Sequence, residues 1–202
     1  MTAAILPDFS AYLTGDRLAH EDAMWAETRY YERNAANILA AARLFNFGDS
    51  FQLIELGCGS GWLPSALPSA IAYVGVDSNP GVLALARGRN YPERRFIECD
   101  IRAFACPPAD LVCSFAVLKH FGLGEWEDIF RRMLRLGACG LFNILTSDGE
   151  PFDDGTEFHR SRVTEATVAR VVAEEGRVIA RRETIDAVEG GAECLFYVGK
   201  AV

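Results

Sequence analysis

The chain has 202 residues, 50% of them hydrophobic and 24% charged, which is typical of one folded domain and excludes long disorder. Its 28 acidic and 20 basic residues give a formal net charge of −8, so no long-range attraction to nucleic acid or anionic membranes is expected. The start lacks the features of a signal peptide, and the six cysteines form no Cys-x-x-Cys pair. We therefore expect a cytoplasmic protein with no DNA partner, no membrane partner and no metal site.

A helical pattern comes first, from about residue 19 to residue 45. The apolar positions that recur at spacings of 4, 3, 4 and 3 are Tyr31, Ala35, Ile38, Ala42 and Phe45. This spacing places them on one face of a helix, and Gly48 is a suitable stop signal. No linker divides the chain, so we predict one domain over residues 1–202. It consists of an N-terminal helical cap, 1–48, and a core of alternating strands and helices, 49–202.

Short apolar runs alternate with helical patterns after residue 48. The predicted strands are Phe51–Leu56, Ile71–Val76, Arg95–Ile97, Leu111–Phe115, Cys139–Leu145, Val178–Ile185 and Cys194–Val198. The predicted helices are Pro80–Arg87, Glu125–Leu136 and Thr164–Glu175. The alternation implies a parallel sheet covered on both faces, whereas the last two strands flank Gly190-Gly191 and predict a hairpin. The predicted fold class is α/β: a doubly wound, mostly parallel seven-stranded sheet with a C-terminal antiparallel hairpin, preceded by an N-terminal helix.

A glycine-rich loop follows the first strand, in the segment Glu55-Leu56-Gly57-Cys58-Gly59-Ser60-Gly61, and a short helix is expected after it. Glycines let the backbone turn tightly and approach a ligand closely. Asp77 ends the next strand, twenty residues after Gly57, and is expected beside the loop, where it could accept hydrogen bonds from a ribose. Asp100 follows the third strand and precedes Ile101, where an adenine edge could be read. The pattern predicts a nucleotide site.

Two common nucleotide-binding motifs do not fit this loop. Dinucleotide dehydrogenases need a small residue five positions after the first glycine, so that helix and strand pack closely. Trp62 stands at that position when Gly57 is counted first, and Pro64 stands there when Gly59 is counted first. A P-loop is also excluded, because no Gly-Lys-Ser/Thr follows.

Four segments resemble motifs of the class I S-adenosylmethionine-dependent methyltransferases. They are the loop segment 55–61, Val74–Asn79, Cys99-Asp100-Ile101 and Ala109–Phe115. The resemblance covers roughly residues 35–200, and the terminal hairpin is similar to the last two strands of that family's Rossmann-like core. It implies a methyltransferase, a transferase that uses S-adenosyl-L-methionine and releases S-adenosyl-L-homocysteine.

The resemblance also implies which residues bind the cofactor. They are Glu55, Gly57, Cys58, Gly59, Asp77, Ser78, Asp100, Ile101, Ser114 and Phe115. The loop backbone would hold the methionine part, and Glu55 would reach its amino group directly or through water. Asp77 would take the ribose hydroxyls, and Asp100 with Ile101 would contact the adenine. Ser114 and Phe115 would line the sulfonium end. The alternative that Asp77 and Asp100 only cap the following helices stays open.

The acceptor side of the site has fewer signals. His120 follows the fourth strand in Val117-Leu118-Lys119-His120-Phe121 and is a candidate general base, with a structural or contact role as the alternative. By resemblance the segment 146–162 lines the acceptor pocket, although it could equally be a solvated loop. No metal is expected, because Ser114 stands where metal-dependent catechol methyltransferases carry an acid.

Motifs of DNA methyltransferases are missing. The residues after the fourth strand do not match the Asn/Asp/Ser-Pro-Pro-aromatic tetrad, and the chain contains no Pro-Cys pair. Together with the acidic charge, this favours a small-molecule acceptor that takes the methyl group on oxygen or nitrogen. Two alternatives remain: a protein or RNA methyltransferase whose partner contributes recognition, and a non-catalytic module that binds S-adenosylmethionine. The sequence leaves the oligomeric state open.

Overall fold

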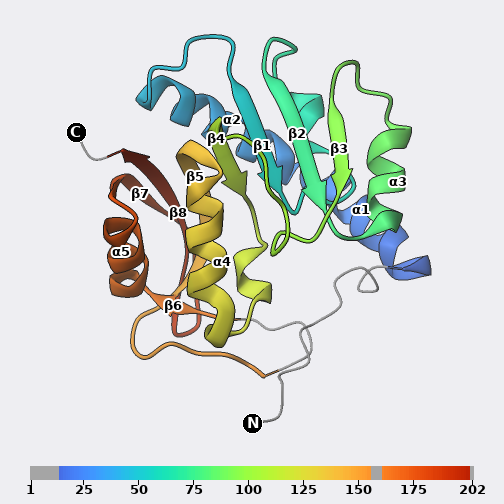
Figure 1. Cartoon of the computed structure of the whole chain (residues 1–202). Coiled ribbons are helices and arrows are strands. Elements are labelled where there is room, and N and C mark those ends of the chain that lie inside the picture. The colour runs from blue at the N-terminus through green and yellow to red at the C-terminus, as the bar shows by residue number, and fades with distance from the viewer. Residues whose placement is uncertain (1–13, 156–160, 201–202) are drawn as a thin grey trace.

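A central sheet with helices on both faces forms the protein in a computed structural model that describes residues 14–155 and 161–200 (Figure 1). The strands are β1 Gln52–Leu56, β2 Ala72–Asp77, β3 Arg95–Glu98, β4 Ala109–Ser114, β5 Gly137–Ser147, β6 Val163–Thr164, β7 Arg177–Val188 and β8 Gly191–Lys200. Seven of them lie in the order β3-β2-β1-β4-β5-β8-β7, and the two-residue β6 pairs with the end of β5. Among the described strands, β8 runs antiparallel to β5 and β7, and all the other strand pairs are parallel. The predicted mostly parallel sheet with a C-terminal antiparallel hairpin is confirmed.

Helices cover the sheet on two sides because the strand residues alternate between two apolar cores. The helices are α1 Gly15–Thr28, α2 Tyr30–Leu44, α3 Pro80–Gly88, α4 Leu123–Arg135 and α5 Glu165–Glu174, with the 3-10 turns η2 Leu63–Ala66 and η3 Leu118–His120. Leu53 of β1 packs into the core under α2 and η2. Its neighbour Ile54 packs into the core under α4 and α5. The sheet is therefore buried on both faces, as the apolar runs predicted.

The N-terminal helical pattern forms two helices, so the single helix predicted over residues 19–45 is wrong. Arg29 separates α1 from α2 with a left-handed φ of 53°. The periodic apolar residues belong to α2, in which Ala35, Ile38 and Ala42 are buried. No residue of α1 is buried, and its half-buried Leu18 packs against the small cluster that contains Val82 and Leu83 instead of against the core under α2.

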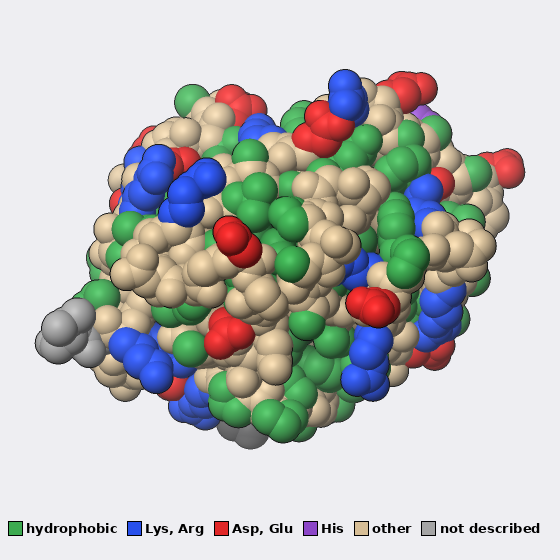
Figure 2. Space-filling view, turned by 90° about the horizontal axis from the view of Figure 1, so that it is seen from above, with side chains coloured by type: hydrophobic (Ala, Val, Ile, Leu, Met, Phe, Trp, Pro, Cys, Tyr) green, Lys and Arg blue, Asp and Glu red, His purple; other side chains and the backbone are tan. Residues whose placement is uncertain are grey.

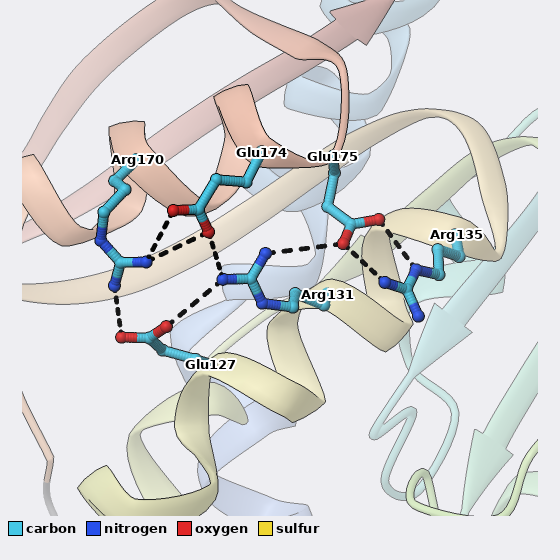
Figure 3. Close-up of polar contacts among 6 residues, drawn as sticks. All are labelled: Glu127, Arg131, Arg135, Arg170, Glu174 and Glu175. Carbon is cyan, nitrogen blue, oxygen red and sulfur yellow. Dashed lines mark hydrogen bonds and ion pairs between the residues drawn. The ribbon is translucent and has the colours of Figure 1, made fainter.

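A charged network joins α4 to α5 on the outer surface (Figure 3). Its members are Glu127, Arg131 and Arg135 of α4 and Arg170, Glu174 and Glu175 of α5. Arg131 contacts Glu127 at 3.4 Å and Glu175 at 3.6 Å and also pairs with Glu174. These arginines lower the pKa of Glu174 and of Glu175. Because the network is largely exposed, it contributes little stability, and the buried Val168 and Val171 hold α5 against the sheet.

The edge of the sheet at the amino ends of the parallel strands has a mixed surface. Figure 2 shows this edge from above, where Lys and Arg side chains and Asp and Glu side chains are scattered among hydrophobic and neutral groups. Within residues 14–155 and 161–200, no helix is long and apolar enough to cross a membrane. Ligand sites of open parallel sheets lie at the opposite edge, where the carboxyl ends of the strands meet.

Candidate active site

A cavity of about 720 Å³ lies at the carboxyl ends of β1, β2, β3 and β4, within the volume range of small-molecule sites. All but one of the ten residues assigned to the cofactor from the sequence line this cavity. They are Glu55, Gly57, Cys58, Gly59, Asp77, Ser78, Asp100, Ile101 and Phe115. His120 lines the same cavity, so the fold brings the predicted cofactor residues and the predicted catalytic residue to one place.

The glycine loop depends on Gly57 for its shape. Gly57 has a left-handed φ of 74°, which side chains disfavour. A Cβ at this position would lie 2.2 Å from Cγ2 of Val117, so only glycine lets the two segments approach. The carbonyl of Val76 accepts the N–H groups of Gly57 at 2.7 Å and Cys58 at 3.1 Å, which fixes the loop on the end of β2.

Asp77 connects the end of β2 to this loop. Its Oδ2 accepts the N–H of Gly59 at 2.9 Å, and its Oδ1 accepts the N–H of Asn79 at 2.9 Å. Burial raises the pKa of Asp77, while hydrogen bonds from the backbone of Asn79, Gly59 and Ser78 act in the opposite direction. The side chain of Asn79 caps α3, so Asp77 is not the N-cap of that helix.

Glu55 is a second carboxyl group in the wall of the cavity. Its side chain is buried, and Oε2 accepts a hydrogen bond from the hydroxyl of Tyr73. Burial raises the pKa of Glu55 to about 8, the hydrogen bond from Tyr73 lowers it, and the charge of Asp77 raises it again. A cationic group bound beside Glu55 would favour its ionised form.

The pKa of Glu55 predicts how stability changes with pH. The folded protein keeps this proton up to about pH 8, whereas the unfolded chain releases it near the ordinary value of 4.5. Stability of the ligand-free protein is therefore expected to fall between these two pH values, by about 1.4 kcal/mol for each unit of difference in pKa. In Glu55→Gln this contribution disappears, so its urea unfolding curves should depend less on pH. Glu150→Gln, at an exposed position, is the control; equal slopes in wild type and Glu55→Gln would contradict the assignment.

Asp100 and Ile101 lie at the end of β3. Asp100 accepts hydrogen bonds from the backbone N–H of Arg102 at 2.7 Å and from its Nη1 at 3.0 Å. The guanidinium of Arg102 also binds both carboxylate oxygens of Glu125 on α4, each at 3.0 Å. A turn and not a helix follows Asp100, so the capping alternative does not hold for this residue, and Asp100 also lines the cavity.

Ser114 was expected to line the cavity, but it does not. Its side chain is 1% exposed, and its hydroxyl has no hydrogen-bond partner among the described residues. Strand side chains alternate, so Cys113 and Phe115 pack on the α2 side while Ser114 does not. After Phe115 the chain turns at Ala116, which has a left-handed φ of 59° and whose N–H is accepted by Oδ1 of Asn143 at 3.3 Å. The turn directs Phe115 and Val117, but not Ser114, to the cavity.

The segment 146–162 packs against the turn that carries His120. Oδ2 of Asp153 accepts the N–H of Leu123 at 3.3 Å, at the start of α4. The N–H of Ser161 donates to the carbonyl of Lys119 at 2.8 Å. Asp154 lines the cavity, which favours the pocket interpretation of this segment over a solvated loop, although residues 156–160 lie outside the described part. Across the two described ranges, no three His, Cys, Asp or Glu residues form a metal-binding group.

Helix α1 lies within the predicted N-terminal helical cap and contributes a wall of the cavity, through residues that the sequence analysis did not single out. Its lining residues are Arg17, Glu21, Met24 and Trp25. They have no apolar periodicity and no motif, so a local pattern could not identify them. Trp62, which stands where a dehydrogenase needs a small residue, also lines the cavity.

Comparison with known proteins supports the same fold. A family model described as a methyltransferase domain matches residues 53–140, and no curated protein sequence matches the chain. The magnesium protoporphyrin IX methyltransferase of Synechocystis PCC 6803, solved with bound S-adenosylmethionine, is 16% identical. Its TM-score is 0.67, and the match covers 93% of this chain and 86% of that chain.

Two further solved structures are similar. One is the 1,6-didemethyltoxoflavin-N1-methyltransferase of Burkholderia thailandensis, solved with 1,6-didemethyltoxoflavin and S-adenosylhomocysteine. It is 16% identical with a TM-score of 0.65, over 99% of this chain and 93% of that chain. The other is the (4+2)-cyclase SpnF, which is 14% identical with a TM-score of 0.68, over 85% of this chain and 82% of that chain. The predicted resemblance is confirmed: residues 53–140 match the methyltransferase domain, and the chain has the fold of the class I S-adenosylmethionine-dependent methyltransferases.

Proposed function

We propose that this protein is an S-adenosylmethionine-dependent methyltransferase that methylates an oxygen or nitrogen atom of a small molecule. The observation that carries the proposal is the position of Asp77, whose carboxylate is bonded to the glycine loop and lines a cavity that extends to His120. A ribose at the loop and an acceptor near His120 would share this single cavity.

The side chains and backbone of the cavity wall fit the groups of the cofactor. Glu55 and Asp77 are two acidic side chains in the cavity wall, suited to an ammonium group and to ribose hydroxyls respectively. The glycines at 57 and 59 leave the backbone accessible to the methionine part. When bound, S-adenosylmethionine supplies an activated methyl group on a sulfonium, and transfer is an in-line displacement in which positioning provides most of the rate.

The other lining residues would contact the adenine, the sulfonium and the acceptor. Asp100 and Ile101, at the end of β3, would contact the adenine. Of the two residues predicted at the sulfonium end, Phe115 lines the cavity and Ser114 does not, so Phe115 alone of this pair would contact the sulfonium. Cys58 and Ser78 would contribute through the backbone of the loop and of the β2 end. His120 would face the acceptor and take its proton if the acceptor must lose one.

A small molecule suits this site better than a macromolecule. Residues of helix α1 and Asp154 both line the cavity. Its volume of about 720 Å³ is that of a small-molecule site. The two similar methyltransferases described above are named for small molecules, a magnesium porphyrin and a toxoflavin precursor.

Calorimetry with S-adenosylmethionine, S-adenosylhomocysteine and NAD tests the cofactor, and only the first two are expected to bind. A cyclase has a similar fold, so the fold alone does not establish methyl transfer, and transfer must be measured directly. For this test, methyl-labelled S-adenosylmethionine is incubated with a panel of small hydroxyl and amino compounds. Label in small molecules supports the proposal. Label only in added protein or RNA would favour that alternative, and binding without transfer to any acceptor would indicate a non-catalytic module.

The role of His120 has its own test. If it is the general base, His120→Ala should lower turnover about 100-fold or more, with affinity for S-adenosylhomocysteine nearly unchanged. Turnover of the wild type should rise with pH as the imidazole becomes neutral, because only the neutral ring accepts a proton. His20→Ala, at an exposed position of α1, is the matched control. A stable and fully active His120→Ala enzyme would remove His120 from this role.

A further inference from the structure

Helix α1 covers the cavity without being part of the core. It lines the cavity through residues such as Met24 and Trp25, yet none of its residues is buried. Leu18, half-buried, packs against the small cluster that contains Val82 and Leu83. At its other end α1 meets α2 at Arg29, a single residue in the left-handed conformation. A helix attached in this way can move without opening the apolar core.

Polar contacts of one acidic side chain hold α1 in place. Oδ1 of Asp22 accepts the indole N–H of Trp62 at 2.8 Å and an N–H of the Arg89 guanidinium at 2.5 Å. The side chains of Asp22 and Arg89 are 25% and 18% exposed, so solvent screens this ion pair less than a surface pair. We name Asp22, Trp62 and Arg89 the latch.

The latch also contacts the glycine loop directly. Nε of Arg89 donates to the carbonyl of Ser60 at 2.7 Å, and its Cζ lies 3.6 Å from the centre of the Trp62 ring. On α2, the ring of Tyr31 stacks on Trp62 with centroids 5.5 Å apart. The group that holds α1 is therefore the same group that supports the loop after Gly59.

We propose that the latch positions α1 and the glycine loop as one unit, so that the cofactor enters and leaves only when Asp22 separates from Trp62 and Arg89. The inference rests on the proposed function, because it assigns the cavity to S-adenosylmethionine. It makes Asp22 a positioning residue for cofactor binding. Trp62, large where a dehydrogenase has a small residue, supplies both the stacking surface and the N–H donor.

Dissociation of S-adenosylhomocysteine from the full chain, followed by stopped-flow tryptophan fluorescence, tests the gate. Asp22→Ala is expected to raise the dissociation rate about tenfold or more. Asp22→Asn, which keeps an acceptor for Trp62 but loses the charge facing Arg89, should give an intermediate rate. Asp16→Ala, at an exposed position on the same helix, should match the wild type. Urea unfolding should be nearly unchanged in all three variants because α1 has no buried residue, whereas a purely structural role would change unfolding and leave the dissociation rate unaltered.

Limited trypsin digestion of the ligand-free protein tests the latch without any cofactor. Cleavage after Arg29, whose side chain is 65% exposed, should be at least about tenfold faster in Asp22→Ala than in the wild type or Asp16→Ala, because an unlatched α1 exposes this junction. Equal cleavage rates would overturn the latch. Equal dissociation rates, in a wild type that binds S-adenosylhomocysteine, would overturn the gate alone. A wild type that binds no S-adenosylhomocysteine would overturn the gate and the proposed function together.

Discussion

Asp77→Ala is expected to weaken binding of S-adenosylhomocysteine by about 10²–10⁴-fold. The variant loses two hydrogen bonds from ribose hydroxyls to a charged acceptor, each worth roughly 1.5–3 kcal/mol. It also loses the bond from Asp77 to the N–H of Gly59, which fixes the loop. Asp77→Asn keeps the shape and one acceptor oxygen, so it should lose affinity to a smaller extent. Calorimetry gives the dissociation constants.

The control for this substitution is Asp49→Asn, an equal change of charge at an exposed turn. Asp77→Ala leaves the N–H groups of Gly59 and Asn79 without this acceptor, whereas Asp77→Asn keeps one acceptor oxygen, so the two variants together separate loss of the ribose contact from loss of stability. Thermal unfolding measures the stability of each variant. A folded Asp77→Ala protein with the affinity of the wild type would refute the ribose assignment.

Removal of residues 190–202 is expected to abolish folding. This deletion takes away β8, which lies between β5 and β7 and pairs with β5 from Gly140 to Ser147. Phe196 belongs to the core under α4 and α5, and Leu195 belongs to the core under α2. The deletion would therefore open both cores and leave the edge of β5 without a partner. The truncated chain should appear in the insoluble fraction after expression.

A point substitution tests the same strand without shortening the chain. A Cβ at Gly191 would lie 1.8 Å from the carbonyl oxygen of Thr146, so Gly191→Val should force β8 away from β5 and lower the soluble yield strongly. Lys200→Ala, exposed at the end of β8, is the control and should be soluble. If the truncated chain were soluble with a cooperative unfolding transition, the observed strand order would be wrong.

The sheet and the centre of the cavity could be predicted from the sequence because local patterns determine them. Apolar runs buried on both faces mark the strands, and parallel strands bring Asp77 to the loop. Ser114 does not line the cavity, because it faces the opposite side of β4 from Cys113 and Phe115. The alternation of side chains along β4 was the available signal.

The wall formed by α1 could not be predicted in the same way. Asp22, Trp62 and Arg89 are far apart in the sequence and belong to no periodic pattern, and their contacts are polar. Residue 29 is an arginine and not a glycine or proline, so the sequence does not mark the end of a helix there, although the φ of Arg29 is positive. Long-range polar contacts of this kind become visible only when the chain is folded.

The position of β8 has a consequence for the growing chain during translation. β8 separates β5 from β7 in space but is synthesised after both. At about 5–20 residues per second, roughly 3–10 s pass between synthesis of the end of β5 and the end of β8. During this interval one edge of β5 has no strand partner, and such edges are where chains associate wrongly. The time for which the nascent protein is exposed to aggregation is therefore set by the translation rate of its last quarter.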